Sequence, residues 1–233
     1  MLTQDCLFSN IDTFLWKDIF CEKLDGYDDV EYVWDVLKRI RGYVENNLSP
    51  AIEGIVEDGA FVEENVYIGE GTVVERGALV KGPSIIGKNC HIRHGAYIRG
   101  YALIGDNCVV GHATEVIRSV FLPCSKAPHF NYVGDSILGT DVNLGAGTKL
   151  SNLKNTSSGI VIKYNGKTFQ TGLRKFGAIL GDRCQTGCNS VLNPGTILGP
   201  DCIVYATSSV RGVYEGKTII KLKQNVETSE FRF

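Results

Sequence analysis

Three of the four histidines are the residues best suited to chemistry, and they are almost evenly spaced. His94 and His112 are eighteen residues apart, and His129 follows seventeen residues later in the segment Lys126-Ala127-Pro128-His129-Phe130-Asn131-Tyr132. Imidazole titrates near neutral pH, so a histidine can accept a proton from a reacting group. Three histidines can also hold a catalytic zinc ion. The elements that position the rings decide between these roles.

Those elements follow a six-residue repeat. An aliphatic residue recurs at every sixth position from Val56 to Leu122, and a small or β-branched residue follows four places later. Gly or Asn often precedes the small residue, because a corner needs backbone conformations that a Cβ atom disfavours. Each hexad is therefore expected to form a short strand and a corner, and three hexads close a triangular coil. Residues eighteen apart then stack about 4.8 Å from each other.

The fold class predicted from this repeat is all-β, a parallel β-helix over residues 51–233. The repeat is interrupted at about 123–136 and again at about 151–178. The second interruption contains Asn165-Gly166, which is typical of a tight hairpin. We expect both segments to leave the stack as loop excursions. Departures from a repeat often carry binding or catalysis, although tolerated surface loops are the alternative.

Residues 1–50 lack the repeat. Val33, Leu37, Ile40 and Val44 have helical spacing. The pattern predicts a short N-terminal helical cap that packs its apolar stripe across the first coil and covers the open strand edges.

Composition excludes several classes of protein. The formal net charge is -2, so no excess of basic residues favours a nucleic-acid partner. The sequence has no apolar run of eighteen residues and no basic start followed by an apolar stretch, so we expect a cytoplasmic protein without a membrane partner. Cys90, Cys108, Cys184 and Cys202 occupy equivalent small positions of the repeat, which predicts buried, reduced thiols.

Four segments carry a family resemblance: Ile98-Arg99, Gly111 to Val116, Ser125 to Asp135, and Val142 to Thr148. They resemble the C-terminal acetyltransferase domain of bifunctional UDP-N-acetylglucosamine pyrophosphorylase / glucosamine-1-phosphate N-acetyltransferase, a hexapeptide-repeat acyltransferase. The resemblance covers roughly residues 50 to 212. It implies a left-handed β-helix that works as a homotrimer, with acetyl-CoA as acyl donor and no metal. The implied acceptor is a small-molecule amino sugar, either phosphorylated or nucleotide-linked.

The same resemblance implies roles for individual residues. His129 takes the place of the general base that removes a proton from the amine. Arg99 would hold a substrate phosphate with its guanidinium fork. The other implied contacts are Tyr132 and Asn143 to the sugar, Asn152 to both sugar and acyl donor, and the backbone of Ala146 to the acyl donor.

Two departures from the family pattern concern the acceptor. Where the family has a basic residue one coil above its phosphate-binding arginine, this chain has Ile117, with Arg118 next to it. The family's Asn-Tyr-Asp-Gly run is replaced by Asn152-Leu153-Lys154-Asn155, and Lys154 is the candidate for a lysine that the family has a few residues later. Phosphate binding is therefore expected to be weakened or rearranged.

Two other interpretations stay open. His94, His112 and His129 could bind a metal between subunits, as in trimeric β-helix carbonic anhydrases, although we expect His129 to lie out of register. The chain could instead be a non-catalytic trimeric scaffold or regulatory partner of a sugar nucleotidyltransferase. The altered phosphate residues and the lack of a glycine-rich nucleotide loop favour that third interpretation.

Overall fold

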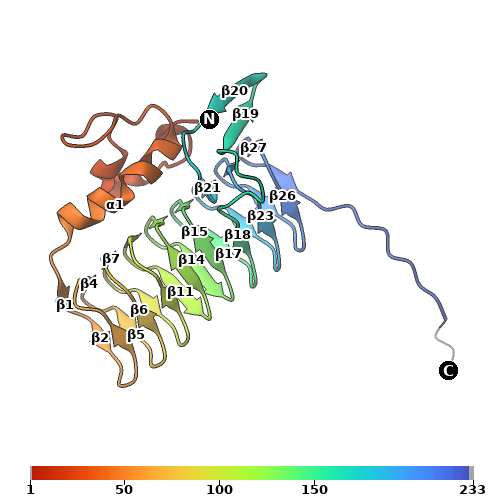
Figure 1. The fold of residues 1–233 in the computed structure, drawn as a ribbon. Coiled ribbons are helices and arrows are strands. Elements are labelled where there is room, and N and C mark those ends of the chain that lie inside the picture. Colours follow the sequence, from red (N-terminus) through yellow and green to blue (C-terminus); the bar gives the residue numbers. More distant parts are fainter. Residues whose placement is uncertain (1, 231–233) are drawn as a thin grey trace.

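Within residues 2–230, twenty-six of the strands stack into three parallel sheets that form the sides of a prism (Figure 1). The structure, a computed structural model, describes residues 2–230. The first sheet contains β1 (Ala51–Ile52), β4 (Val66–Ile68), β7 (Ser84–Ile86), β10 (Ala102–Ile104), β13 (Val120–Phe121), β16 (Ile137–Leu138), β21 (Ala178–Leu180), β24 (Thr196–Leu198) and β27 (Val213–Tyr214). The second contains β2 (Ile55–Val56), β5 (Val73–Val74), β8 (His91–Ile92), β11 (Val109–His112), β14 (Lys126–His129), β17 (Asn143–Leu144), β22 (Gln185–Thr186), β25 (Ile203–Val204) and β28 (Ile219–Ile220). The third contains β3 (Phe61–Val62), β6 (Leu79–Val80), β9 (Tyr97–Ile98), β12 (Glu115–Ile117), β15 (Tyr132–Gly134), β18 (Lys149–Leu150), β23 (Val191–Leu192) and β26 (Ser209–Val210).

The interior of the prism is one continuous apolar core. Ile86, Ile92 and Ile98, one from each side of a single coil, have no exposed surface. The small residues of the repeat point inward as well, and Cys90, Cys108, Cys184 and Cys202 are all buried. The fold class predicted from the repeat, a parallel β-helix with a short N-terminal helix, is confirmed.

The expected excursion at 123–136 is wrong, because this segment remains within the stack. β14 and β15 continue the second and third sheets, with Ala127 beside Val110 and Tyr132 beside Glu115. The coil has only seventeen residues, since Val120 rather than Phe121 pairs with Leu103. Arg118 turns the shortened corner in the left-handed conformation, with φ 45°. The Asp135 corner of the next coil is short in the same way, since Leu138 rather than Gly139 pairs with Phe121. The apparent break in the repeat therefore begins with the one-residue deletion at Arg118.

This deletion also corrects the inward position expected for Leu122. Phe121 pairs with Ile104 and fills the prism interior, whereas Leu122 belongs to a second apolar cluster outside it. Both side chains are fully buried. The sequence pattern alone could not distinguish them, because both are apolar.

Residues 151–178 do leave the stack. β16 pairs with β21 across this segment, and the hairpin predicted at Asn165-Gly166 is confirmed as β19 (Val161–Tyr164) and β20 (Lys167–Gln170). Asn165 and Gly166 both have positive φ, at 48° and 72°, as the tightest hairpin turns require.

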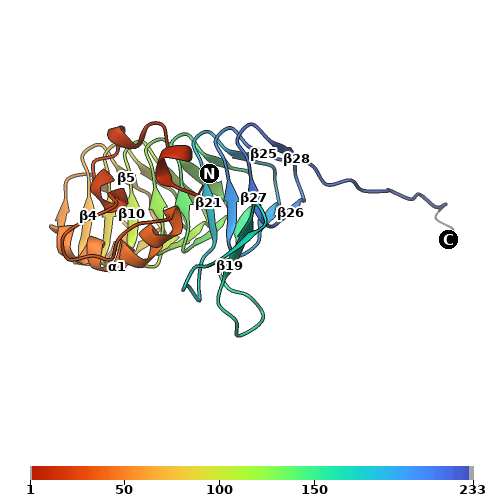
Figure 2. The same ribbon diagram turned by 90° about the horizontal axis from the view of Figure 1, so that it is seen from above.

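The helical segment lies along a side of the prism instead of over its open end, which corrects the expected position of the cap (Figure 2). It contains η1 (Gln4–Cys6), η2 (Ile11–Thr13), η3 (Lys17–Phe20), η4 (Val33–Asp35) and α1 (Val36–Asn47). Val36 and Ile40 pack in one cluster with Ile85 and Leu103, which face outward from the first sheet. That face is apolar and must be covered. The first coil stays open, and its inward residues Val56, Ala60 and Val62 are only partly buried.

Arg39 holds the helical segment together from within. Its side chain is 3% exposed and donates hydrogen bonds to the backbone carbonyls of Ile19, Cys21, Glu22 and Asp28 at 2.5–3.2 Å. Burial lowers the pKa of the guanidinium, so the carbonyls must compensate for its lost hydration.

We predict that Arg39→Ala lowers the free energy of unfolding by about 3 kcal/mol, because four carbonyls lose a charged donor. The measurement is urea denaturation followed by circular dichroism. Arg76→Ala is the matched control, since the Arg76 side chain is 74% exposed and lies 3.8 Å from Glu57. The control should change stability by less than about 0.5 kcal/mol. Equal denaturation midpoints for the two variants would contradict the role of Arg39.

Candidate active site

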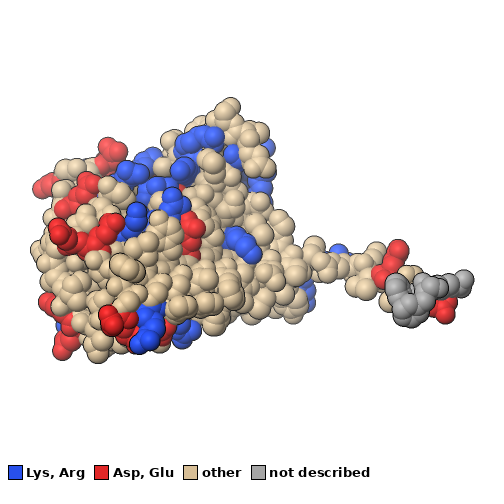
Figure 3. Space-filling view, turned by 60° about the horizontal axis from the view of Figure 1, so that its bottom comes forward, with Lys and Arg blue, Asp and Glu red and all other residues tan. Residues whose placement is uncertain are grey.

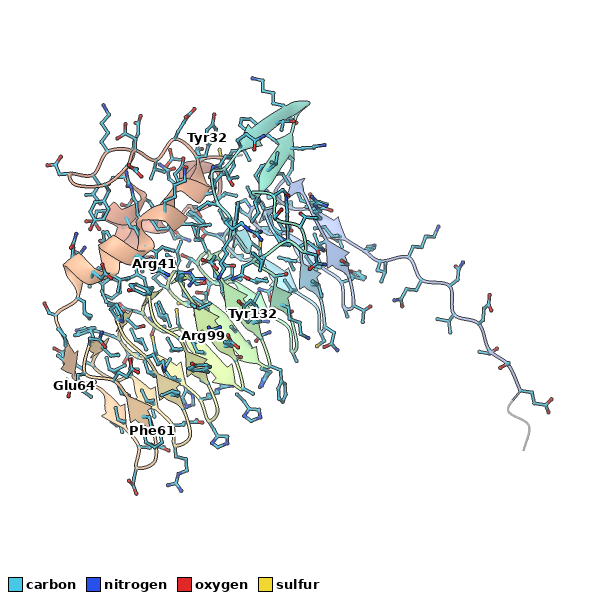
Figure 4. All side chains as sticks on the ribbon, viewed as in Figure 1. Tyr32, Arg41, Phe61, Glu64, Arg99 and Tyr132 are labelled. Atoms are coloured by element: carbon cyan, nitrogen blue, oxygen red, sulfur yellow. The ribbon has the colours of Figure 1, made fainter. Side chains whose placement is uncertain are left out.

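The outward face of the third sheet carries a row of polar side chains. Tyr97, Glu115 and Tyr132 are neighbours in register on β9, β12 and β15. Arg99 follows β9, and its Nη1 donates to Glu115 Oε1 at 2.6 Å. This bond raises the pKa of Arg99, whose side chain is 41% exposed. Arg99 and Tyr132 lie on the same side of the stack (Figure 4).

A second polar group occupies the corner between the third and first sheets. Arg118 Nε and Nη2 donate to the two oxygens of Asp135 at 2.7 and 3.0 Å. Asn152 Nδ2 donates to Asp135 Oδ2 at 2.5 Å, and Asn152 is 8% exposed. Asp135 therefore links the Arg118 guanidinium to the side-chain amide of Asn152, which is a candidate ligand-binding group.

Tyr132 and Asn152 meet over Gly134. A Cβ atom at Gly134 would lie 2.6 Å from Asn152 Nδ2 and 2.7 Å from the Tyr132 hydroxyl. A larger residue at this position would displace one of these side-chain ends. Burial, with Glu115 and Asp135 adding to it, raises the pKa of the Tyr132 phenol further above neutral pH. A phenol is a hydrogen-bond donor at neutral pH in any case.

His129 is exposed at the end of β14, at the corner before Tyr132. Its backbone N–H donates to Asn131 Oδ1 at 3.0 Å, and Asn131 Nδ2 donates in turn to the Gly145 carbonyl at 2.8 Å. The buried Asn131 amide thus fixes the corner that carries the imidazole. In the described part of the chain, no hydrogen bond engages the imidazole itself.

His129 is in register with the other two histidines, contrary to the expectation from sequence. His112 and His129 are paired neighbours on β11 and β14. The rings of His94 and His112 stack with centroids 5.7 Å apart. Over residues 2–230, no group of three or more metal-ligating side chains converges within this single chain.

The remaining predicted residues lie apart from this group. Asn143 is on β17 of the second sheet, between Lys126 and Gln185. Ala146 is in the corner that follows, and its carbonyl accepts a hydrogen bond from the Asn189 N–H at 2.8 Å. One chain therefore brings Arg99, Tyr132 and Asn152 together but leaves Asn143 and Ala146 beyond the histidine corner.

Lys154 lines a cavity formed by the 151–178 excursion. Its Nζ donates to the Gly159 carbonyl at 2.7 Å. The cavity has a volume of about 520 Å³ and also includes Asn193 and Arg211. Ile117 is 8% exposed, and Arg118 beside it is bound by Asp135, so Arg118 does not replace the family's basic residue on the third-sheet face.

Sequence reasoning missed Glu115 and Asp135, the two carboxylates that position Arg99, Arg118 and Asn152. A usable signal existed for Glu115: it is eighteen residues after Tyr97 and therefore on the same face as Arg99. Asp135 lies beyond the one-residue deletion, where the eighteen-residue spacing no longer applies.

Residues 80–228 match the family described as GMPPB C-terminal domain. The chain belongs to this family. It is also 41% identical over 211 residues to a bifunctional protein GlmU of Methanococcus maripaludis, covering 90% of this chain and 51% of that protein. A bifunctional protein GlmU of Methanococcus vannielii is 35% identical over 205 residues, which is 88% of this chain and 49% of that protein.

A shorter match joins the chain to a bifunctional sugar-1-phosphate nucleotidylyltransferase/acetyltransferase of Sulfurisphaera tokodaii. The identity is 40% over 93 residues, covering 40% of this chain and 23% of that protein. The chain spans about half the length of the two GlmU proteins. The resemblance predicted from the sequence is confirmed by these matches. Among residues 2–230, no helix has the length and apolar character needed to span a bilayer.

We predict that Asp135→Asn destabilises the protein by about 2 kcal/mol, because it leaves the largely buried Arg118 without its carboxylate. Asp201→Asn is the matched control. Asp201 binds Arg183 through the same two-bond geometry, at 2.7 and 2.9 Å, but the two side chains are 34% and 45% exposed. The control should cost less than about 1 kcal/mol. Thermal unfolding of both variants measures the difference, and an equal loss would show that Asp135 has no special structural role.

Proposed function

We propose that the chain is an acetyl-CoA-dependent N-acetyltransferase for an amino-sugar phosphate or a nucleotide-linked amino sugar. The observation that carries this proposal is the exposed His129 imidazole, at a corner whose backbone Asn131 fixes, beside a face that presents Arg99 and Tyr132. The alignment with bifunctional GlmU proteins over 88% to 90% of the chain supports it. Their names do not specify the acceptor, and Ile117 favours one other than glucosamine 1-phosphate.

The chemistry assigned to His129 is proton transfer. The acceptor's ammonium group gives one proton to solvent, and its amine nitrogen forms a bond to the acetyl carbonyl carbon supplied by the donor thioester. The imidazole removes the second proton from nitrogen as that bond forms. The C–S bond then breaks, and the imidazolium returns this proton to the departing sulfur. An amide and a free thiol are the products, and His129 is restored.

Arg99 and Tyr132 would orient the acceptor. The guanidinium of Arg99 offers a phosphate two parallel donors, and its bond to Glu115 fixes the direction of the fork. Tyr132 and Asn152 offer a hydroxyl and an amide, which suit sugar hydroxyls.

A homotrimer is part of the proposal. Asn143 on the second sheet and Ala146 in the corner that follows it lie on another side of the prism from Arg99 and Tyr132. A neighbouring copy that presents its second sheet to this third sheet would complete a site with all four residues. We expect the three-sided prism to form a cytoplasmic trimer with the acyl donor in the groove between copies, which light scattering can test.

We predict that His129→Ala lowers the rate of thiol release from acetyl-CoA by about 10² to 10⁴-fold while the protein stays folded. The assay uses a panel of amino-sugar phosphates and UDP-amino sugars. His94→Ala and His112→Ala are the controls, and at least one of them should retain activity. An unchanged rate in His129→Ala would refute the proposed base.

Arg99→Ala should raise the KM for a phosphorylated acceptor by about 10 to 100-fold with a smaller effect on kcat, because the lost bonds are made in the ground state as well. The comparison acceptor is the same amino sugar without phosphate, whose KM should not change. An equal increase in the KM of both acceptors would show that Arg99 does not bind the phosphate.

Two alternatives have an observation in their favour. One relative is a bifunctional sugar-1-phosphate nucleotidylyltransferase/acetyltransferase, and Ile117 at the family's basic position is consistent with a non-catalytic partner of a nucleotidyltransferase. A trimer that turns over no acceptor of the panel would support that role. The in-register histidines favour a metal between subunits, and stoichiometric zinc lost in both His94→Ala and His112→Ala would support it.

A further inference from the structure

A cleft lies between helix α1, the Arg118 corner and the segment that follows β20. Its volume is about 350 Å³, and five cationic side chains line it. Lys38 and Arg41 come from α1, Arg118 from the corner, and Arg174 and Lys175 from the segment between β20 and β21. Arg41 projects from the helix above the stack in Figure 4. Lys and Arg gather toward the middle of the molecule in Figure 3, whereas Asp and Glu are more frequent over its first coils.

The positive charge of this cleft is only partly compensated. Asp135, the one carboxylate of its lining, is bound to Arg118, and Asp35 accepts a bond from Lys38 Nζ at 2.7 Å. Over the described residues 2–230, no carboxylate forms an ion pair with Arg41, Arg174 or Lys175. Three like charges that converge from two distant segments repel each other. An anion in the cleft would offset that repulsion.

Three of the five cations, Arg118, Arg41 and Lys38, are held in place before any ligand binds. Two bonds from Asp135 fix the guanidinium of Arg118, whose side chain is 16% exposed. The Arg41 guanidinium lies over the Tyr101 ring, 4.7 Å from its centroid, and the Tyr101 hydroxyl donates to Glu45. A Cβ atom at Gly172 would be 3.9 Å from Lys38 Nζ, so Lys38 reaches the segment that carries Arg174. Such preorganisation favours a compact polyanion.

We propose that this cleft is a binding site for an organic diphosphate, such as a nucleoside diphosphate or nucleotide sugar, separate from the candidate active site. A diphosphate carries charge to match the three uncompensated cations, and Leu37 and Leu173 supply apolar walls for the attached group. The cleft lies across the Asp135 carboxylate from Asn152. The site would use helix α1, which no acetyl-transfer role requires.

Binding is tested by calorimetry on the full chain with UDP, GDP and inorganic pyrophosphate. The double variant Arg174→Gln/Lys175→Gln should raise the Kd for UDP or GDP at least tenfold, and Arg41→Gln should raise it severalfold. Both changes are at exposed positions, so the fold should be kept, and circular dichroism checks this. Salt should weaken binding in the wild type more than in the double variant. Tighter binding of UDP or GDP than of pyrophosphate would support a contribution from the apolar walls, and equal binding would assign recognition to the diphosphate alone.

The control is Lys154→Gln/Arg211→Gln, which changes the basic pair in the cavity of the 151–178 excursion. It should leave the Kd unchanged, as should His129→Ala. No binding of any of the three ligands at millimolar concentration would overturn the proposal, as would a loss of binding confined to the Lys154 and Arg211 variant. These outcomes do not depend on acetyl transfer. Diphosphate binding in the cleft can therefore be refuted while the proposed acetyltransferase function holds, and the acetyltransferase function can be refuted while diphosphate binding holds.

Discussion

Interstrand hydrogen bonding between successive coils is the constraint on which the rest of the structure depends. Each short strand has too few residues to be stable alone, and it gains its order by pairing with the strands one coil before and after it. Pairing fixes the register, so a residue and its partner seventeen or eighteen places later share a face. The polar row of Tyr97, Glu115 and Tyr132 exists because of this register. Arg99 meets Glu115 for the same reason.

The same register creates an apolar outer face that needs a cover. Strands of the first sheet place Ile85, Leu103 and Val120 one after another on the outside of the prism. These side chains have almost no exposed surface, because the N-terminal helical segment lies on them. A hydrophobic requirement thus brings α1 against the stack, and Arg41 and Lys38 come with it on the side of the helix nearest the Arg118 corner. The basic cleft is a consequence of that packing.

The sequence was sufficient to predict the coils, the inward aliphatic positions and the Asn165-Gly166 hairpin, because each depends on local spacing and turn chemistry. It was insufficient at the Arg118 and Asp135 corners, because each corner lacks one residue and each loss shifts every later position by one more. The side-on position of α1 was missed for another reason. Outward apolar residues such as Ile85 and Leu103 are present in the sequence, but the six-residue repeat marks only inward positions. The roles expected for His129, Arg99, Tyr132, Asn143, Asn152, Lys154 and Ala146 stay predictions.

Asp135 is the residue through which the two proposed sites can affect each other. One of its oxygens, Oδ2, accepts bonds from both Arg118 and Asn152. An anion that draws Arg118 toward the cleft would weaken its hold on Oδ2, and this oxygen would then attract the Asn152 amide more strongly. Asn152 contacts the space over Gly134 that Tyr132 also borders. A shift of the amide would therefore change the polar groups offered to a sugar, without any movement of the coils that carry them.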